Sequence, residues 1–361
     1  MLRDKQADLG AVFGLFLGAE AVIEYGVGSA AEYAAAKRAV GLMDRSTLGR
    51  IELSGADRLE FLHRMSTNDI RALKPDAGLQ TVLTTPEAKI IELLTVYAKQ
   101  ASLLCVTSPQ NGAKVLSWLK RNIFFRDKVK PVDVSQLTVQ LSLFGPRAGE
   151  LLRTLSGQDM DSVASYHTRT LSVEGRSVLA GRLPGAAGGG FDLIADAANG
   201  DALWDVLLAA GKEFGLLPLG TQAYDALRIE AGQPLYGSEL SEEVNPLEAG
   251  LKHAISFAKG CYTGQEVIAR LDTYQKLKQT LVRLRLSDLP EGALPLPLQV
   301  GETEIGRLTS AARLPGSEVT GLGYVRMKAY HPGSHAVVNA GGQSIDATLV
   351  PLLEIPETFE V

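Results

Sequence analysis

Short apolar runs and helical spacings of apolar residues follow one another along the first 280 residues. Alternating or clustered apolar residues predict strands, whereas apolar residues three and four positions apart predict amphipathic helices. By this criterion strands are predicted at residues 79–83, 90–97, 102–107, 138–144, near 168–183 and at 190–195. Helices are predicted at residues 31–40, 58–65, 112–120, 146–155 and 201–214. This order indicates the α+β class with mainly antiparallel sheets.

The pattern changes near residue 280. Beyond it, short β-rich runs alternate with Gly and Pro turns at residues 281–286, 304–310, 318–325, 336–339 and 344–349. Such spacing predicts a small all-β barrel or sandwich of about 80 residues. We therefore expect a C-terminal β-domain at 281–361, preceded at 1–280 by two intertwined α+β subdomains with an internal boundary near 135–150.

Composition narrows the class of protein. The 361 residues include 36 Lys and Arg against 41 Asp and Glu, a formal charge of −5, with 45% hydrophobic and 21% charged residues. These values are typical of a globular protein, and the acidic balance argues against direct nucleic-acid binding. No run approaches the roughly 20 apolar residues of a membrane span, so no membrane association is expected.

Two further features bear on location and metal chemistry. Apolar residues 9–18 follow Arg3 and Lys5 as in an export signal, but Asp4 and Asp8 cancel the basic charge, so we expect a cytoplasmic protein. The chain has two cysteines, which excludes a disulfide framework and a self-contained thiolate metal site. No metal site is therefore predicted.

One segment carries the clearest chemical signal. It reads Lys259-Gly260-Cys261-Tyr262-Thr263-Gly264-Gln265-Glu266. Thr263 and Glu266 form a capping box, which predicts a helix from Gly264. The predicted buried stripe of this helix is Val267, Ile268, Leu271 and Tyr274. Cys261 would then lie just before a helix N-terminus, with Lys259 as a nearby cation, and both effects favour a reactive thiolate.

The two cysteines differ in their surroundings. Cys261 is flanked by residues that predict a reactive thiol, although a small residue in a Gly-rich turn is the alternative interpretation. Cys105 lies within the apolar run 103–106, which predicts a passive core thiol. Any reactive thiol in this chain must therefore be sought at Cys261.

The same eight residues resemble the signature of the YgfZ family, folate-binding relatives of the glycine-cleavage T protein. Further resemblance to segments shared with T protein extends over residues 9–13, 40–46, 66–69, 227–232 and 245–251. The resemblance implies an α+β fold in which α/β domains with antiparallel sheets form a ring around a central folate site, closed by the C-terminal β-barrel. It also implies tetrahydrofolate or a derivative as cofactor.

Three candidate ligand residues follow from the resemblance. Asp192, in Gly190-Phe191-Asp192, is placed like the acid that holds the pterin edge, and a carboxylate can accept two hydrogen bonds there. A strand-end aspartate without ligand is the alternative. Tyr224 stands where T protein has an arginine, so it could stack on folate but not supply a charge. Arg228 matches the family arginine, as a ligand contact or as part of a structural ion pair.

The resemblance also frames the activity. Rough alignment puts Gln100 or Ala101 at the place of the essential T-protein aspartate, and neither can hold a charge. The implied function is a folate-binding accessory protein with iron–sulfur proteins as partners. It would assist iron–sulfur enzyme maturation or repair, affect tRNA modification indirectly, and use Cys261 as its thiol. The main alternative is an aminomethyltransferase of glycine cleavage that uses tetrahydrofolate. A folate-dependent oxidase or demethylase subunit and a scaffold with a vestigial pocket are the remaining alternatives.

Overall fold

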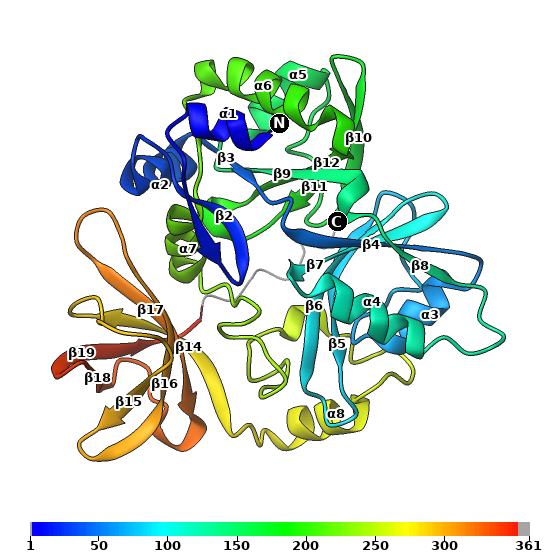
Figure 1. The fold of residues 1–361 in the computed structure, drawn as a ribbon. Coiled ribbons are helices and arrows are strands. Elements are labelled where there is room, and N and C mark those ends of the chain that lie inside the picture. The colour runs from blue at the N-terminus through cyan, green and yellow to red at the C-terminus, as the bar shows by residue number, and fades with distance from the viewer. Residues whose placement is uncertain (1, 353–361) are drawn as a thin grey trace.

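The structure is a computed structural model that describes residues 2–352. Two sheets and a barrel are arranged around the middle of the molecule (Figure 1). The chain begins with helix α1 (Leu2–Asp8) and the hairpin β1 (Val12–Phe16) and β2 (Ala19–Glu24). The apolar residues that resembled an export signal therefore include an antiparallel hairpin strand.

The first sheet has six strands in the order β10-β11-β12-β9-β3-β13. Their bounds are β3 (Val40–Asp44), β9 (Thr138–Phe144), β10 (Thr168–Val173), β11 (Arg176–Leu183), β12 (Gly190–Asp196) and β13 (Leu216–Pro218). The associated helices are α2 (Ser29–Arg38), α5 (Ala148–Ser156), α6 (Gly200–Gly211) and α7 (Thr221–Glu230). All pairs are antiparallel except β13 with β3.

The second sheet has five antiparallel strands in the order β5-β6-β7-β4-β8. They are β4 (Leu48–Ser54), β5 (Gly78–Thr84), β6 (Ile90–Ala98), β7 (Ser102–Pro109) and β8 (Lys130–Asp133). Helices α3 (Arg58–Met65) and α4 (Gly112–Arg121) pack against one face. The chain leaves the first sheet after β3, builds the second sheet, and returns to the first at β9.

A closed barrel completes the fold. Helix α8 (Gln265–Tyr274) leads into strands in the order β14-β17-β16-β15-β18-β19. Their bounds are β14 (Gln279–Leu286), β15 (Leu296–Val300), β16 (Thr303–Arg313), β17 (Val319–Arg326), β18 (His335–Ala340) and β19 (Gln343–Val350). The predicted α+β class, with mainly antiparallel sheets and a C-terminal β-barrel, is confirmed.

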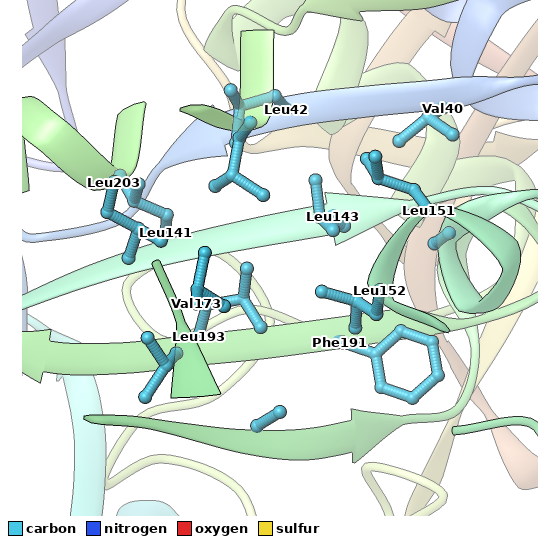
Figure 2. Close-up of a cluster of buried hydrophobic side chains, with 14 of the residues drawn as sticks. Val40, Leu42, Leu141, Leu143, Leu151, Leu152, Val173, Phe191, Leu193 and Leu203 are labelled. Carbon is cyan, nitrogen blue, oxygen red and sulfur yellow. The ribbon is translucent and has the colours of Figure 1, made fainter. Parts of the chain in front are cut away.

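The largest core determines which side chains remain for a site. Leu141 and Leu143 of β9 and Phe191 and Leu193 of β12 point into a cluster with helices α5 and α6 (Figure 2). Burying each such side chain contributes roughly 1.5–3 kcal/mol. Because successive side chains of a strand point to opposite faces, Asp192 lies on the other face of the sheet.

The second sheet follows the same rule. Leu94 and Val96 of β6 pack into the core beneath α3 and α4. The alternate residues Leu93, Thr95 and Tyr97 therefore face the opposite way. The faces of the two sheets opposite these cores carry the side chains that can form a site, and α2 and α7 partly cover that face of the first sheet.

Candidate functional site

A cavity lies between these two faces. Its volume is about 140 Å³, and it is open on one side. The first sheet and α7 contribute Phe144, Asp192, Tyr224 and Arg228, and the second sheet contributes Gln80, Leu93, Thr95, Val106 and Thr107. Further lining residues include 45, 166, 233–236, 240, 251 and 253. A concave pocket onto which polar side chains converge is typical of a small-molecule site.

Asp192 is the single carboxylate on the described cavity wall, and it is 2% exposed. Ser142 donates to its Oδ1 at 2.5 Å, and the Tyr97 hydroxyl donates to its Oδ2 at 3.1 Å. The Arg45 guanidinium lies 3.6 Å from Oδ1. Burial, together with this carboxylate, raises the pKa of Tyr97 well above its usual value, so Tyr97 stays a neutral donor. The buried charge is therefore oriented and partly compensated.

Tyr224 forms an aromatic part of the same wall. Its ring centroid lies 5.4 Å from that of Phe144, with the planes tilted by 43°. The guanidinium of Arg45 stands 5.3 Å above the Tyr224 ring, within cation–π distance. Arg45 thus provides, beside Tyr224, the positive charge that a tyrosine at position 224 cannot supply. Arg45 falls within the resembling segment 40–46, but the sequence offered no sign that it meets residues about 150 to 180 positions later.

Arg228 borders the cavity, but each of its three guanidinium nitrogens already donates a hydrogen bond. Nε donates to Asp225 at 2.6 Å, Nη1 to Glu239 at 2.7 Å and Nη2 to Ser310 of the barrel at 2.7 Å. The side chain is buried between two carboxylates. Of the two roles expected for Arg228, the structure therefore shows the structural ion pair, which joins α7 to the barrel.

A second polar group of the cavity belongs to the other sheet. The Gln80 side-chain oxygen accepts from the Tyr166 hydroxyl at 2.9 Å and lies 3.0 Å from Nε2 of His253. The Gln80 amide nitrogen donates to Thr95 at 3.3 Å. Burial lowers the pKa of His253 to about 4, so the imidazole is neutral at pH 7. Sequence reasoning missed this group because its members come from separate parts of the chain.

Lys259 does not act as the expected activating cation. Its ammonium is buried and donates to the backbone oxygens of His63, Ser66 and Asn68. Burial lowers the pKa of Lys259 to about 8. The three carbonyl partners assign this side chain to holding the loop after α3, and the expected role beside the thiol is wrong. Sequence adjacency suggested a partner, but the fold turns the ammonium inward.

The predicted surroundings of Cys261 also change. Helix α8 begins at Gln265, and its N-cap Gly264 adopts a left-handed conformation (φ 85°) without a side-chain capping bond. The expected capping box is therefore absent, and Ile268 alone of the expected stripe is buried. Cys261 itself is exposed and is not on the cavity wall. Cys105 is buried, as predicted, and burial raises the pKa of its thiol to about 12.

Gln100 and Ala101, expected at the place of a catalytic aspartate, are not found at the cavity. Gln100 and Ala101 lie in the exposed turn between β6 and β7 and do not line it. The structure therefore places this turn away from the candidate site. The second sheet lines the cavity through strand residues, such as Leu93 and Thr95, and not through this turn.

Two general expectations concern metals and membranes. Within residues 2–352 no group of three or more His, Cys, Asp or Glu side chains is placed to hold a metal ion. Among the helices in the described part of the chain, none is long and apolar enough to cross a membrane.

Comparison with known proteins identifies relatives. Residues 2–259 match the family model of the GCVT N-terminal domain. The aminomethyltransferase of Moorella thermoacetica is 34% identical over 286 residues, which are 79% of this chain and 77% of the relative. That of Halothermothrix orenii is 31% identical over 323 residues, 89% of this chain and 90% of the relative. A chloroplastic Arabidopsis thaliana protein, named as a transferase, is 34% identical over 300 residues, 83% of this chain and 68% of the relative.

A solved structure shows the same fold. The glycine cleavage system aminomethyltransferase T from Bartonella henselae superimposes with a TM-score of 0.88 over 99% of this chain and 98% of its own. The two sequences are 22% identical, so this likeness establishes the fold alone. The arrangement of sheets and barrel described above is that of this fold.

Proposed function

The chain belongs to the GCVT N-terminal domain family, and from this membership we propose that its central cavity binds tetrahydrofolate, with Asp192 holding the pterin edge. The observation that carries the proposal is the oriented, buried carboxylate of Asp192. A carboxylate can accept from both the amino group and the adjacent ring N–H of a pterin. Tyr224 and Phe144 supply an aromatic surface for the ring.

The residues present fit such a ligand. Ser142 and Tyr97 hold Asp192 so that ligand binding need not reorganise it, which preserves binding free energy. Arg45 offsets the negative charge of the buried carboxylate. Arg228 stabilises the cavity wall through its ion pairs, and we assign it no ligand contact.

The activity that we propose for this site is aminomethyl transfer. Bound tetrahydrofolate would supply the amines that accept a one-carbon unit. Curated relatives that are 31–34% identical over most of their length are named aminomethyltransferase, which supports this reaction. Of the two sequence arguments against it, the one from Tyr224 loses its force, because Arg45 places a cation beside that ring. The missing aspartate still counts against it, because Asp192 is the single carboxylate on the described cavity wall. The chain's part is to bind, orient and shield the reactants.

The binding step is tested by calorimetry with tetrahydrofolate under anaerobic conditions. Asp192→Asn removes the charge at the wall, and we expect at least a tenfold loss of affinity, about 1.4 kcal/mol or more. Asp196→Asn is the matched control, because Asp196 is an exposed residue at the end of the same strand. Equal affinities of the three proteins would contradict the assignment of Asp192.

The transfer step needs its own assay. The wild-type protein is incubated with tetrahydrofolate and aminomethylated lipoyl carrier protein, and formation of 5,10-methylenetetrahydrofolate is followed. Turnover that falls in Asp192→Asn but not in Asp196→Asn supports aminomethyl transfer. Tight folate binding without any turnover would reject the transferase and leave the binding proposal standing.

A second candidate function is favoured by one observation, the exposure of Cys261 within the segment 259–266. An exposed thiol away from the cavity can be reached by a partner protein. We propose as the alternative a YgfZ-like folate-binding accessory role toward iron–sulfur proteins, with an indirect effect on tRNA modification. The test is complementation of a strain that lacks the gene. If Cys261→Ser restores iron–sulfur enzyme activity fully, the thiol role is rejected.

A further inference from the structure

The cavity wall carries a second fixed polar group, at His253. Its imidazole is half-buried in the short helix Lys252–Ala254, which lies beside the second sheet. Both His253 and Asp192 line the same cavity. Asp192 belongs to the first sheet, and its proposed role involves that sheet only. His253, beside the second sheet, therefore has no assigned role.

Hydrogen bonding fixes the tautomer of this histidine. The Gln80 amide nitrogen donates to Thr95, so the Gln80 oxygen is the atom that faces Tyr166 and His253. An amide oxygen only accepts, and Nε2 of His253 must therefore carry the hydrogen at this 3.0 Å contact. In a neutral imidazole the other nitrogen is then a bare acceptor. Nδ1 of His253 is that acceptor.

An acceptor that faces the second ring of a pterin distinguishes two oxidation states of that pterin. The amino group and ring N–H that a carboxylate such as Asp192 would bind are the same in oxidised and reduced pterins. The second ring differs, because N5 and N8 are bare acceptors in the oxidised form and carry hydrogens in the tetrahydro form. A fixed acceptor can accept a hydrogen bond from an N–H of the reduced ring. On the oxidised ring it faces a lone pair, which repels it.

We propose that His253 is a specificity-determining residue that makes the cavity select reduced over oxidised pterins. Gln80 is its positioning residue, because it holds the tautomer that leaves Nδ1 as an acceptor. The inference rests on the proposed folate binding, and it assigns to His253 a discrimination that Asp192 cannot provide. A site built around a hydrogen bond rejects a ligand that lacks the matching donor much more strongly than a site that relies on shape.

The selectivity is measured by anaerobic calorimetry with tetrahydrofolate and with folic acid. We expect the wild type to prefer tetrahydrofolate by about 100-fold or more. His253→Phe keeps a flat ring but removes the acceptor, and the preference should fall at least tenfold. His253→Asn, which retains an acceptor, should recover part of it. Asp192→Asn should weaken both ligands and leave their ratio unchanged.

These outcomes separate the two proposals. A wild type that binds neither pterin would overturn folate binding and this inference together. Binding of tetrahydrofolate with the same preference in wild type and His253→Phe would overturn the inference alone. Equal weakening of both ligands in His253→Phe would show a merely structural histidine, which also overturns it.

The tautomer can be tested without any ligand. Nitrogen-15 NMR of protein labelled at its five histidines shows the state of each ring, and the signals missing from His253→Phe identify His253. We expect a neutral ring with the hydrogen on Nε2 between pH 6 and 8. Gln80→Leu should release this preference. Finding the hydrogen on Nδ1 in the wild type would reject the inference whatever the folate result.

Discussion

Replacing Lys259 with Met should destabilise the protein strongly. The Lys259 ammonium, in a residue that is 7% exposed, donates to the Ser66 oxygen at 2.6 Å, to the Asn68 oxygen at 2.9 Å and to the His63 oxygen. Methionine keeps most of the length of the side chain but leaves three carbonyl acceptors without this donor. Each buried acceptor left unpaired costs roughly 1–3 kcal/mol, and partial rescue by water reduces the sum. We expect a loss of about 3–5 kcal/mol.

The measurement is urea unfolding at pH 7, followed by circular dichroism and tryptophan fluorescence together. The midpoint should fall while the slope m stays constant, because the surface exposed on unfolding is unchanged. Cys261→Ser is the matched control two residues away, and because its side chain is exposed we expect a change within about 0.5 kcal/mol. A Lys259→Met protein that loses less than about 1 kcal/mol, but whose Cys261 is alkylated more slowly, would refute the structural role and restore the activating one.

Three further substitutions test other parts of the structure. Arg228→Met should cost about 3–5 kcal/mol in urea unfolding, because it leaves the fully buried carboxylate of Glu239 without its cation; Arg228→Lys should recover part of that loss. Burial raises the pKa of Glu92 to about 7, so its contribution to stability is full below pH 4.5 and is lost as pH rises to about 7. Relative to Glu92→Gln, the wild type should therefore lose about 3 kcal/mol between pH 4.5 and 7.5, and parallel pH profiles of the two proteins would contradict this. Tyr97→Phe removes a donor to Asp192 and should weaken tetrahydrofolate binding roughly tenfold in calorimetry, whereas unchanged affinity would show that this hydroxyl does not support the carboxylate.

The hydrophobic pattern predicted much of the two sheets because strand alternation is a local property. Residues 138–144 and 190–195 were predicted as strands, and the structure has β9 and β12 there. Once β12 is known, alternation alone puts Asp192 on the face opposite Phe191 and Leu193. The sequence could not show what Asp192 would meet. Tyr97 reaches it from the other sheet, 95 positions earlier, and that encounter depends on how the two sheets pack.

The segment 259–266 was harder to interpret for the same physical reason. Thr263 and Glu266 have the spacing of a capping box, but Gly264 takes a left-handed conformation that moves the start of α8 to Gln265. Lys259 is two positions from Cys261 in sequence, yet its ammonium is held by carbonyls more than 190 positions earlier. The spacing of residues along the chain predicts helices well. It does not predict which buried groups a charged side chain will contact.

Arg228 connects the ligand cavity to the barrel. It borders the cavity on one side, and its guanidinium donates to Ser310 of β16 on the other. Glu239 accepts from Arg228, from Ser310 and from Thr309, so the same buried carboxylate holds both the loop beside the cavity and the barrel strand. Releasing the barrel would therefore expose an ion pair that the cavity wall needs.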